Sequence, residues 1–180
     1  PPLAGFFTQG LNGDWRNFTP FPRQPVIDWA NPNLRHIDLT GDGFADLMLT
    51  RDEGIEWYRS LARDGFAQPE FLAHPPDDED GPRRVFADGA EALHLADMNG
   101  DGLADLVRVR NGEICYWPSL GYGRFGPKVV MDGAPVFDRP DQFDPKRVRL
   151  ADIDGSGVTD LIYLGHDAVR IYLNESGNGW

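Results

Sequence analysis

The sequence predicts an all-β protein assembled from repeated sheets, and three observations support this fold class. A motif of alternating aspartate and glycine residues recurs three times, beginning at Asp38, Asp97 and Asp152, so the repeat period is about 55–60 residues. Short apolar runs flank each copy at lengths typical of strands. No segment sustains the apolar periodicity of an amphipathic helix, so we expect little or no helix.

Each motif has the composition of a loop that folds around a hard cation. In the second copy, oxygen-bearing side chains stand at the first, third, fifth and ninth places, and glycine fills the fourth and sixth. The residue at the seventh place would supply its backbone carbonyl. The expected ligands are therefore Asp97, Asn99, Asp101, Leu103 and Asp105. Calcium takes about 6–8 oxygen ligands, and converging carboxylates without a cation would repel one another. Plain turns are the alternative, because Asp and Asn also cap turns through their own backbone.

Two other kinds of cation loop fit the sequence less well. An EF-hand needs a glutamate at the twelfth place of the loop, where this sequence has Leu49, Arg108 and Tyr163. Magnesium seldom uses a cage made only of protein ligands. Calcium is therefore the expected ion.

Composition excludes several classes of partner. The chain has 180 residues and a formal net charge of −12, so we expect no nucleic acid and no anionic membrane, since both attract basic patches. Cys115 is the single cysteine, which rules out an intrachain disulfide and favours a buried thiol. No apolar run approaches the roughly 18 residues of a membrane span. The chain opens with Pro1-Pro2, without Met or a signal peptide, so we expect a piece of a longer protein.

The repeats predict β-propeller blades. Four short antiparallel strands in a unit of this length are the sequence form of such a blade. We expect the whole chain, 1–180, to be one propeller segment that a larger chain or a second copy completes. Its expected parts are the end of a preceding blade, two full repeats and an incomplete third: 1–33, 34–91, 92–146 and 147–180.

Each repeat is expected to contain its strands in one order. The first leads into the acidic loop, the second leaves it, the third follows a tight turn, and the fourth is an outer strand. The predicted strands are 34–37, 45–50, 55–59 and 66–72; 92–96, 104–109, 114–117 and 125–131; and 147–151, 159–164 and 169–173. Asn111-Gly112 predicts a two-residue hairpin turn with positive φ at both residues. The connections 74–90 and 132–146 are long, and such connections are usually functional or mobile.

The motif, followed by a hairpin and the run Gly121–Pro127, resembles the FG-GAP or VCBS repeat. The longer runs 95–126 and 147–155 are similar to the propeller region of the B component of bacterial insecticidal toxin complexes and of SpvB-type virulence proteins. This resemblance implies a secreted, non-enzymatic propeller that is a gate and docking platform between a cargo shell and the channel of the A component. The implied partners are the A and C components, beside other blades or a second copy.

The resemblance also implies up to three calcium ions, one in each loop. The implied ligands, with the seventh place offering its carbonyl, are Asp38, Thr40, Asp42, Phe44 and Asp46; Asp97, Asn99, Asp101, Leu103 and Asp105; and Asp152, Asp154, Ser156, Val158 and Asp160. Thr40 and Ser156 depart from the acidic or amide pattern and are weaker ligands. Asp105 is expected to bind through both oxygens.

Two other classes of function stay open on the residues alone. Trp57, Trp117 and Tyr172 hold matching positions and could stack a sugar in a lectin or an integrin-like adhesin, although core packing is the favoured role. A carboxylate pair could serve a hydrolase with an accessory propeller. The aspartates, however, lie in repeated equivalent turns, whereas an active site is normally unique, and the histidines share no metal-ligand spacing. We therefore expect no enzyme.

Overall fold

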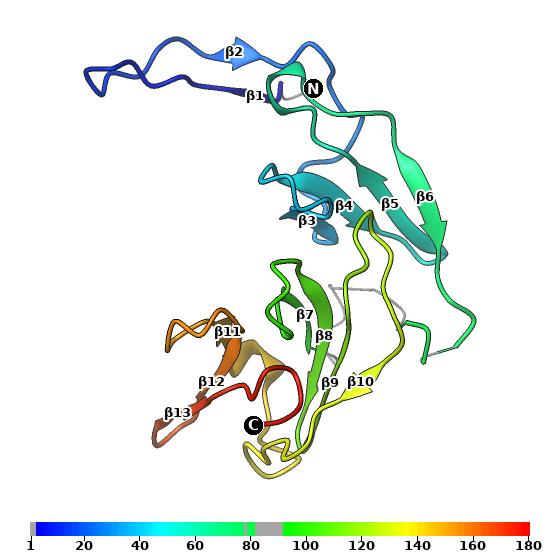
Figure 1. The fold of residues 1–180 in the computed structure, drawn as a ribbon, viewed down its shortest axis with the longest axis vertical. Helices are drawn as coiled ribbons and strands as arrows, with labels where there is room; N and C mark the ends of the chain where they lie inside the picture. The colour runs from blue at the N-terminus through cyan, green and yellow to red at the C-terminus, as the bar shows by residue number, and fades with distance from the viewer. Residues whose placement is uncertain (1–2, 78, 82–91) are drawn as a thin grey trace.

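The structure is a computed structural model that describes residues 3–77, 79–81 and 92–180. Its antiparallel sheets follow one another along an open arc (Figure 1). Within the described ranges the helical segments are two short 3-10 turns, η1 (Ala62–Asp64) and η2 (Pro145–Arg147). The all-β fold class is confirmed. No helix in the described part of the chain has the length and apolarity needed to cross a membrane.

Blade one is the sheet β3-β4-β5-β6, formed by β3 (Leu34–Ile37), β4 (Asp46–Thr50), β5 (Gly54–Tyr58) and β6 (Glu70–Ala73). Every residue of β4 is buried, because a central strand covered on both faces has no solvent side. The first three strands lie within one residue of the predicted bounds. The outer strand begins later than predicted, because the N–H of Phe66 donates to the carbonyl of Arg23 in the N-terminal segment.

Blade two is the sheet β7-β8-β9-β10, formed by β7 (Ala92–Ala96), β8 (Asp105–Arg110), β9 (Glu113–Trp117) and β10 (Val129–Val130). Its first three strands also lie within one residue of the predicted bounds. β10 is much shorter than the predicted 125–131. Phe125 makes only an isolated bridge to Ser119, and Pro127 has no N–H to donate to a ladder.

The two-residue turn between β8 and β9 lies at Asn111-Gly112 as predicted, but its backbone differs from the prediction at the first residue. Gly112 has a φ of 80°, but Asn111 is not among the described residues with positive φ. The Asn111 side chain is used instead: Oδ1 accepts from Phe137 N at 2.7 Å and Nδ2 donates to Asp138 O at 2.8 Å. Asn111 therefore acts through its amide, which ties the following connection to the blade, and not through a left-handed backbone.

Blade three is the sheet β11-β12-β13, formed by β11 (Val148–Ala151), β12 (Asp160–Leu164) and β13 (Val169–Tyr172), all within one residue of prediction. The described residues add no fourth strand to it. Gly179 instead forms a parallel bridge with Asp132, which lays the chain end against blade two.

The N-terminal segment repeats the outer half of a blade. β1 (Gly5–Phe6) pairs with β2 (Thr19–Pro20). Between them lies an isolated antiparallel bridge that has counterparts in blades one and two; the three bridges are Gln9–Trp15, Ser60–Phe66 and Ser119–Phe125. The segment therefore repeats the pattern of an antiparallel pair with an isolated bridge that blades one and two show.

The core lies between blades. We call the face of a blade that points toward the next blade in the chain its forward face. The forward face of blade one is buried against residues of blade two and comprises Ile37, Leu39, Met48, Ile55 and Trp57. The matching face of blade two packs on Val148, Leu161 and Tyr163 of blade three. By strand register, the forward face of blade three holds Ile153, Leu164, Val169 and Ile171, which are 38–61% exposed. Nothing in the described part of the chain covers that face.

The connection 132–147 is packed against blades two and three. The ring of Phe137, 2% exposed, stacks on Tyr163 at 4.8 Å and on Phe143 at 5.5 Å between centroids. Arg170 donates to the carbonyl of Phe137 at 2.6 Å. The structure thus gives this connection a packing role. In the connection 74–90, residues 78 and 82–90 lie outside the described residues.

His94 of β7 makes stability depend on pH. Burial, with the positive charge of Arg149, lowers the pKa of His94 from 6.5 to about 4, and its Nε2 has no hydrogen-bond partner. Between these two values the unfolded chain binds a proton that the folded chain does not, so stability is lost as the pH falls.

We expect His94→Gln to reduce the drop in melting temperature between about pH 7 and about pH 4.5, measured by circular dichroism in chelator. His166→Gln, at an exposed turn, is the matched control and should keep the wild-type drop. Equal drops in wild type and His94→Gln would contradict this assignment.

Candidate metal centre

The three acidic loops, named loop one (38–46), loop two (97–105) and loop three (152–160), share a buried aspartate at the ninth place. Asp46, Asp105 and Asp160 are each 0% exposed. In every case Oδ2 accepts the N–H of the second-place residue at 2.9 Å. Oδ1 accepts an N–H that lies 14 residues later, at 2.7–2.9 Å, from Ser60, Ser119 and Asn174 respectively. One carboxylate thus joins the start of the loop to the end of the third strand.

The first-place aspartates point into the loop backbone. Asp38, Asp97 and Asp152 each accept the N–H groups of the fourth-place and sixth-place glycines at 2.7–3.1 Å. These six glycines have φ of 76–90°, a conformation that glycine adopts without the strain a Cβ would bring. The two glycines of the motif therefore serve to turn their N–H groups toward the first carboxylate.

The third and fifth places differ between loops. The fifth-place carboxylates of Asp42 and Asp101 accept the seventh-place N–H at 2.9 Å and 2.8 Å, so they are held against their own turn. Loop three has Ser156 at the fifth place and its acidic residue, Asp154, at the third. Asp154 accepts the N–H of Ser156 at 2.9 Å.

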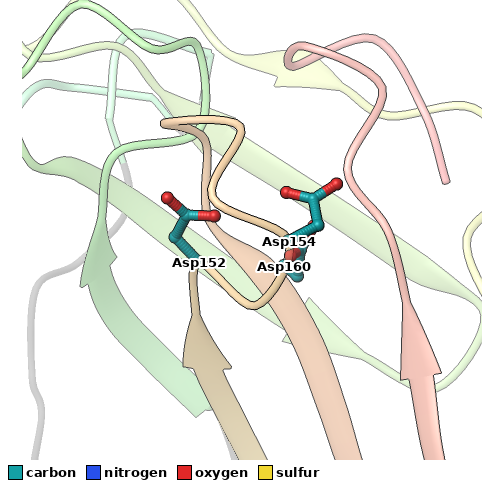
Figure 2. Close-up of side chains that lie close together, drawn as sticks. All are labelled: Asp152, Asp154 and Asp160. Atoms are coloured by element: carbon teal, nitrogen blue, oxygen red, sulfur yellow. The ribbon is translucent and has the colours of Figure 1, made fainter.

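Three carboxylates converge in loop three. Among the described residues they form the one group of at least three acidic, imidazole or thiol side chains that could hold a metal ion. One oxygen from each of Asp152, Asp154 and Asp160 lies within 4.8 Å of the others, around one loop (Figure 2). Oxygens on opposite sides of a calcium ion stand about 4.8 Å apart, twice the bond length of about 2.4 Å. In loops one and two the third place is neutral (Thr40 and Asn99), and their three aspartates do not converge to this distance.

Burial, and after it the neighbouring charges, raises the pKa of the ninth-place carboxyl groups in loops one and two. Burial, then the charges of Asp101 and Asp97, raises the pKa of Asp105 from 3.8 to about 6. Burial, with Asp42 and Asp38, also raises the pKa of Asp46. An opposite charge nearby favours the ionised form of a carboxyl group, so a cation in these loops would offset the cost of their ionised aspartates.

Sequence reasoning treated the ninth-place aspartate only as a ligand and missed its structural bonds. The available signal was the constant spacing of 14 residues to Ser60, Ser119 and Asn174. Each oxygen of Asp105 already accepts one N–H, but a carboxylate offers about four lone-pair sites and can also bind an ion.

The other predicted residues have structural places. Trp57 and Trp117 are 1% and 0% exposed, which confirms core packing, and Cys115 is buried as predicted. His36 stacks on Trp29 at 6.1 Å.

Four-stranded antiparallel sheets, a recurrent loop between their first two strands, and face-to-face packing along an arc define this chain as a β-propeller segment. Residues 38–108 match the FG-GAP-like repeat family. The chain is similar to the Tc holotoxin pore of Photorhabdus luminescens, with 36% identity over 99% of its length and a TM-score of 0.83. It spans 8% of the length of that Tc chain.

Two further solved structures are similar with lower TM-scores. A TcdB2–TccC3 complex without its hypervariable C-terminal region is 33% identical over 99% of this chain and 8% of its own, with a TM-score of 0.49. An Agrocybe aegerita lectin that recognises non-reducing terminal N-acetylglucosamine is 22% identical over 79% of this chain and 35% of its own, with a TM-score of 0.58. That likeness shows the fold alone. No curated protein matches the sequence.

Asp105→Asn tests the structural role of the ninth place without metal. The new amide group would face an N–H donor where an oxygen accepted a bond, so we expect a loss of about 2 kcal/mol of unfolding free energy in chelator. Urea unfolding followed by fluorescence measures it.

Asp101→Asn is the matched control, because residue 101 is exposed and asparagine still offers an oxygen to Leu103 N. Its metal-free stability should change by less than about 0.5 kcal/mol. Equal losses in the two variants would contradict the distinction between the ninth and fifth places.

Proposed function

We propose that this chain is a calcium-binding β-propeller scaffold for protein–protein interaction, within the gate and docking region of a toxin-complex B component. The observation that carries the proposal is the similarity to the Tc holotoxin pore along 99% of the chain, at 36% identity and a TM-score of 0.83. Because the chain spans 8% of that Tc chain, its partners are proposed by likeness: the A and C components, with action outside the producing cell.

Loop three supports the calcium part of the proposal best. Its donors are all oxygens, which suit a hard cation, and three of them already lie within 4.8 Å of one another. Asp152, Asp154 and Asp160 would hold the ion, together with the hydroxyl of Ser156 and the carbonyl of Val158. Loops one and two would bind after their fifth-place aspartates turn inward. The ion would supply charge neutralisation between carboxylates.

The scaffold role follows from what the residues do to the backbone. In each blade the ninth-place carboxylate fixes the loop to the third strand. In blades one and two the forward face also packs on the next blade. Acidic residues in three equivalent loops offer no single site where an acid, a base and an oxyanion donor converge. We propose that the chain has no catalytic activity of its own and presents rigid surfaces to other proteins.

The aromatic residues considered for sugar binding are packed inside the protein, which disfavours the lectin alternative. Trp57 and Trp117 are too buried to stack on a ligand, and the ring of Tyr172 packs edge-on against Phe137 at 5.7 Å. No described contact favours an adhesin or a hydrolase over the scaffold.

Calcium should stabilise the folded chain. Binding to the native state alone adds about 2.7 kcal/mol at a hundredfold excess over Kd, which corresponds to a rise of roughly 5–10 °C in melting temperature for a chain of this size. We expect EGTA to lower the melting temperature and Ca²⁺ to restore it further than Mg²⁺, measured by differential scanning calorimetry.

Calorimetric titration assigns the ion to loop three. Asp154→Asn should remove one calcium from the binding stoichiometry, whereas Asp77→Ala, at an exposed position outside the loops, should remove none. If neither EGTA nor Ca²⁺ changes the melting temperature, calcium binding is refuted in all three loops.

The exposed forward face of blade three should make the isolated chain associate, because apolar faces of this kind are covered in blades one and two. We expect light scattering to show dimers or larger species at micromolar concentration, and Ile171→Lys to weaken them. Leu120→Lys, which removes an apolar side chain 60% exposed elsewhere, is the control. A wild-type monomer at all concentrations would contradict this expectation.

A further inference from the structure

The three acidic loops touch one another in series. A Cβ placed on the fourth-place glycine of loop one, Gly41, would lie 3.1 Å from Cδ2 of Leu103, the seventh-place residue of loop two. In loop two, a Cβ on Gly100 would lie 3.1 Å from Cγ1 of Val158, the seventh-place residue of loop three. Leu103 and Val158 therefore each rest on the fourth-place glycine of the preceding loop.

Two hydrogen bonds to the backbone of loop two reinforce its contact with blade three. Thr159 N donates to the carbonyl of Asp97, the first-place residue of loop two, at 2.8 Å. Asn174, which follows blade three, donates through Nδ2 to the carbonyl of Met98 at 2.9 Å. Loop two is thus held at its first, second and fourth places by residues of blade three.

The two ends of the series lack this contact and provide internal controls. Val158 is 6% exposed, whereas Phe44, the seventh-place residue of loop one, is 50% exposed, and the described residues contain no loop before it. Gly155, the fourth-place residue of loop three, has no atom within 4 Å of a Cβ position. The same residue types in the same motif therefore occur with and without a neighbouring loop.

We propose that the loops are conformationally coupled, and that Leu103 and Val158 each hold the preceding loop in its hydrogen-bonded shape. The N–H of Gly100 donates to Asp97 at 2.7 Å, and Val158 packed on Gly100 keeps that N–H in place. Val158 is then a positioning residue for loop two, through its side chain, and an expected ligand in loop three, through its carbonyl.

Coupling between two sites is reciprocal. An ion that fixes the carbonyl of Val158 in loop three also fixes the side chain that supports loop two, so occupancy of either loop favours the other. This calcium consequence rests on the proposed function. The mechanical coupling between the loops does not, because its contacts exist without an ion.

Hydrogen exchange in chelator tests the coupling without metal. In Val158→Ala, which keeps every backbone carbonyl, peptides covering loop two should exchange about fivefold faster than in wild type. Loop one should be unchanged, since Leu103 still covers it. Phe44→Ala removes a seventh-place side chain that touches no loop glycine and should leave loop two unchanged. Equal loop-two exchange in Val158→Ala and Phe44→Ala would overturn the proposal.

Two glycine variants give an independent test of the coupling. This test is used if circular dichroism shows that Val158→Ala does not fold. Gly100 and Gly155 have φ of 81° and 76°, so alanine meets similar backbone strain at both. Gly100→Ala should speed exchange in loop three about fivefold by displacing Val158, whereas Gly155→Ala, where a Cβ meets no atom of a neighbouring loop, should speed exchange in loop two by less than that. Unchanged loop-three exchange in Gly100→Ala would overturn the coupling.

Calcium titration of the same variants separates the two proposals. With coupling, Val158→Ala weakens calcium binding in loop two about fivefold, although no ligand of that loop has changed, and Phe44→Ala does not. If no variant binds calcium but the exchange rates still differ, the calcium proposal fails and the coupling stands. If calcium binds normally and loop two behaves alike in both variants, the coupling fails and the calcium proposal stands.

Discussion

Two backbone N–H groups donate to one buried carboxylate in every blade, and the rest of the structure depends on this arrangement. The carboxylates of Asp46, Asp105 and Asp160 are inaccessible to water, so each must be compensated inside the protein. Hydrogen bonds to a charged group contribute about 1.5–3 kcal/mol each. Because the two donors lie on either side of the blade's inner hairpin, the pair of bonds fixes the acidic loop relative to the end of the third strand.

The packing between blades follows from this constraint. The N–H that bonds Oδ2 belongs to the second-place residue, and the bond turns that residue's side chain toward the forward face. Leu39 and Met98 are consequently 1% and 0% exposed in the cores between blades. Ile153 holds the same place in blade three and is 42% exposed, because the described residues supply no neighbour there. The hydrogen bond from the second-place N–H to the ninth-place carboxylate thus sets where the second-place apolar side chain packs.

The loops combine a structural and an electrostatic role, and these roles conflict. The buried aspartate needs its charge to accept two strong bonds. Burial, and then the fifth-place and first-place carboxylates, nevertheless raise the pKa of Asp105 to about 6. The divalent cation that we propose for these loops would resolve the conflict. Loop three, with its acid at the third place, gathers its oxygens in a single cluster, whereas Asp42 and Asp101 bond to their own turns. A propeller whose blades are braced in this way suits a rigid docking platform.

The sequence by itself determined the fold class, the three loops and nine of the eleven predicted strands to within a residue. It could do so because period, turn glycines and alternating apolar residues are local signals. The short outer strands were mispredicted because Phe66 and Phe125 are held by partners distant in the chain or by isolated bridges. The two-residue turn at Asn111-Gly112 was predicted correctly, but the positive φ expected at Asn111 was wrong. The bonds of its amide to residues 137 and 138 cannot be seen in the local sequence. Only the tertiary structure decided which carboxylates converge and which loop rests on which glycine, because both depend on how separate blades pack, and no single repeat encodes that geometry.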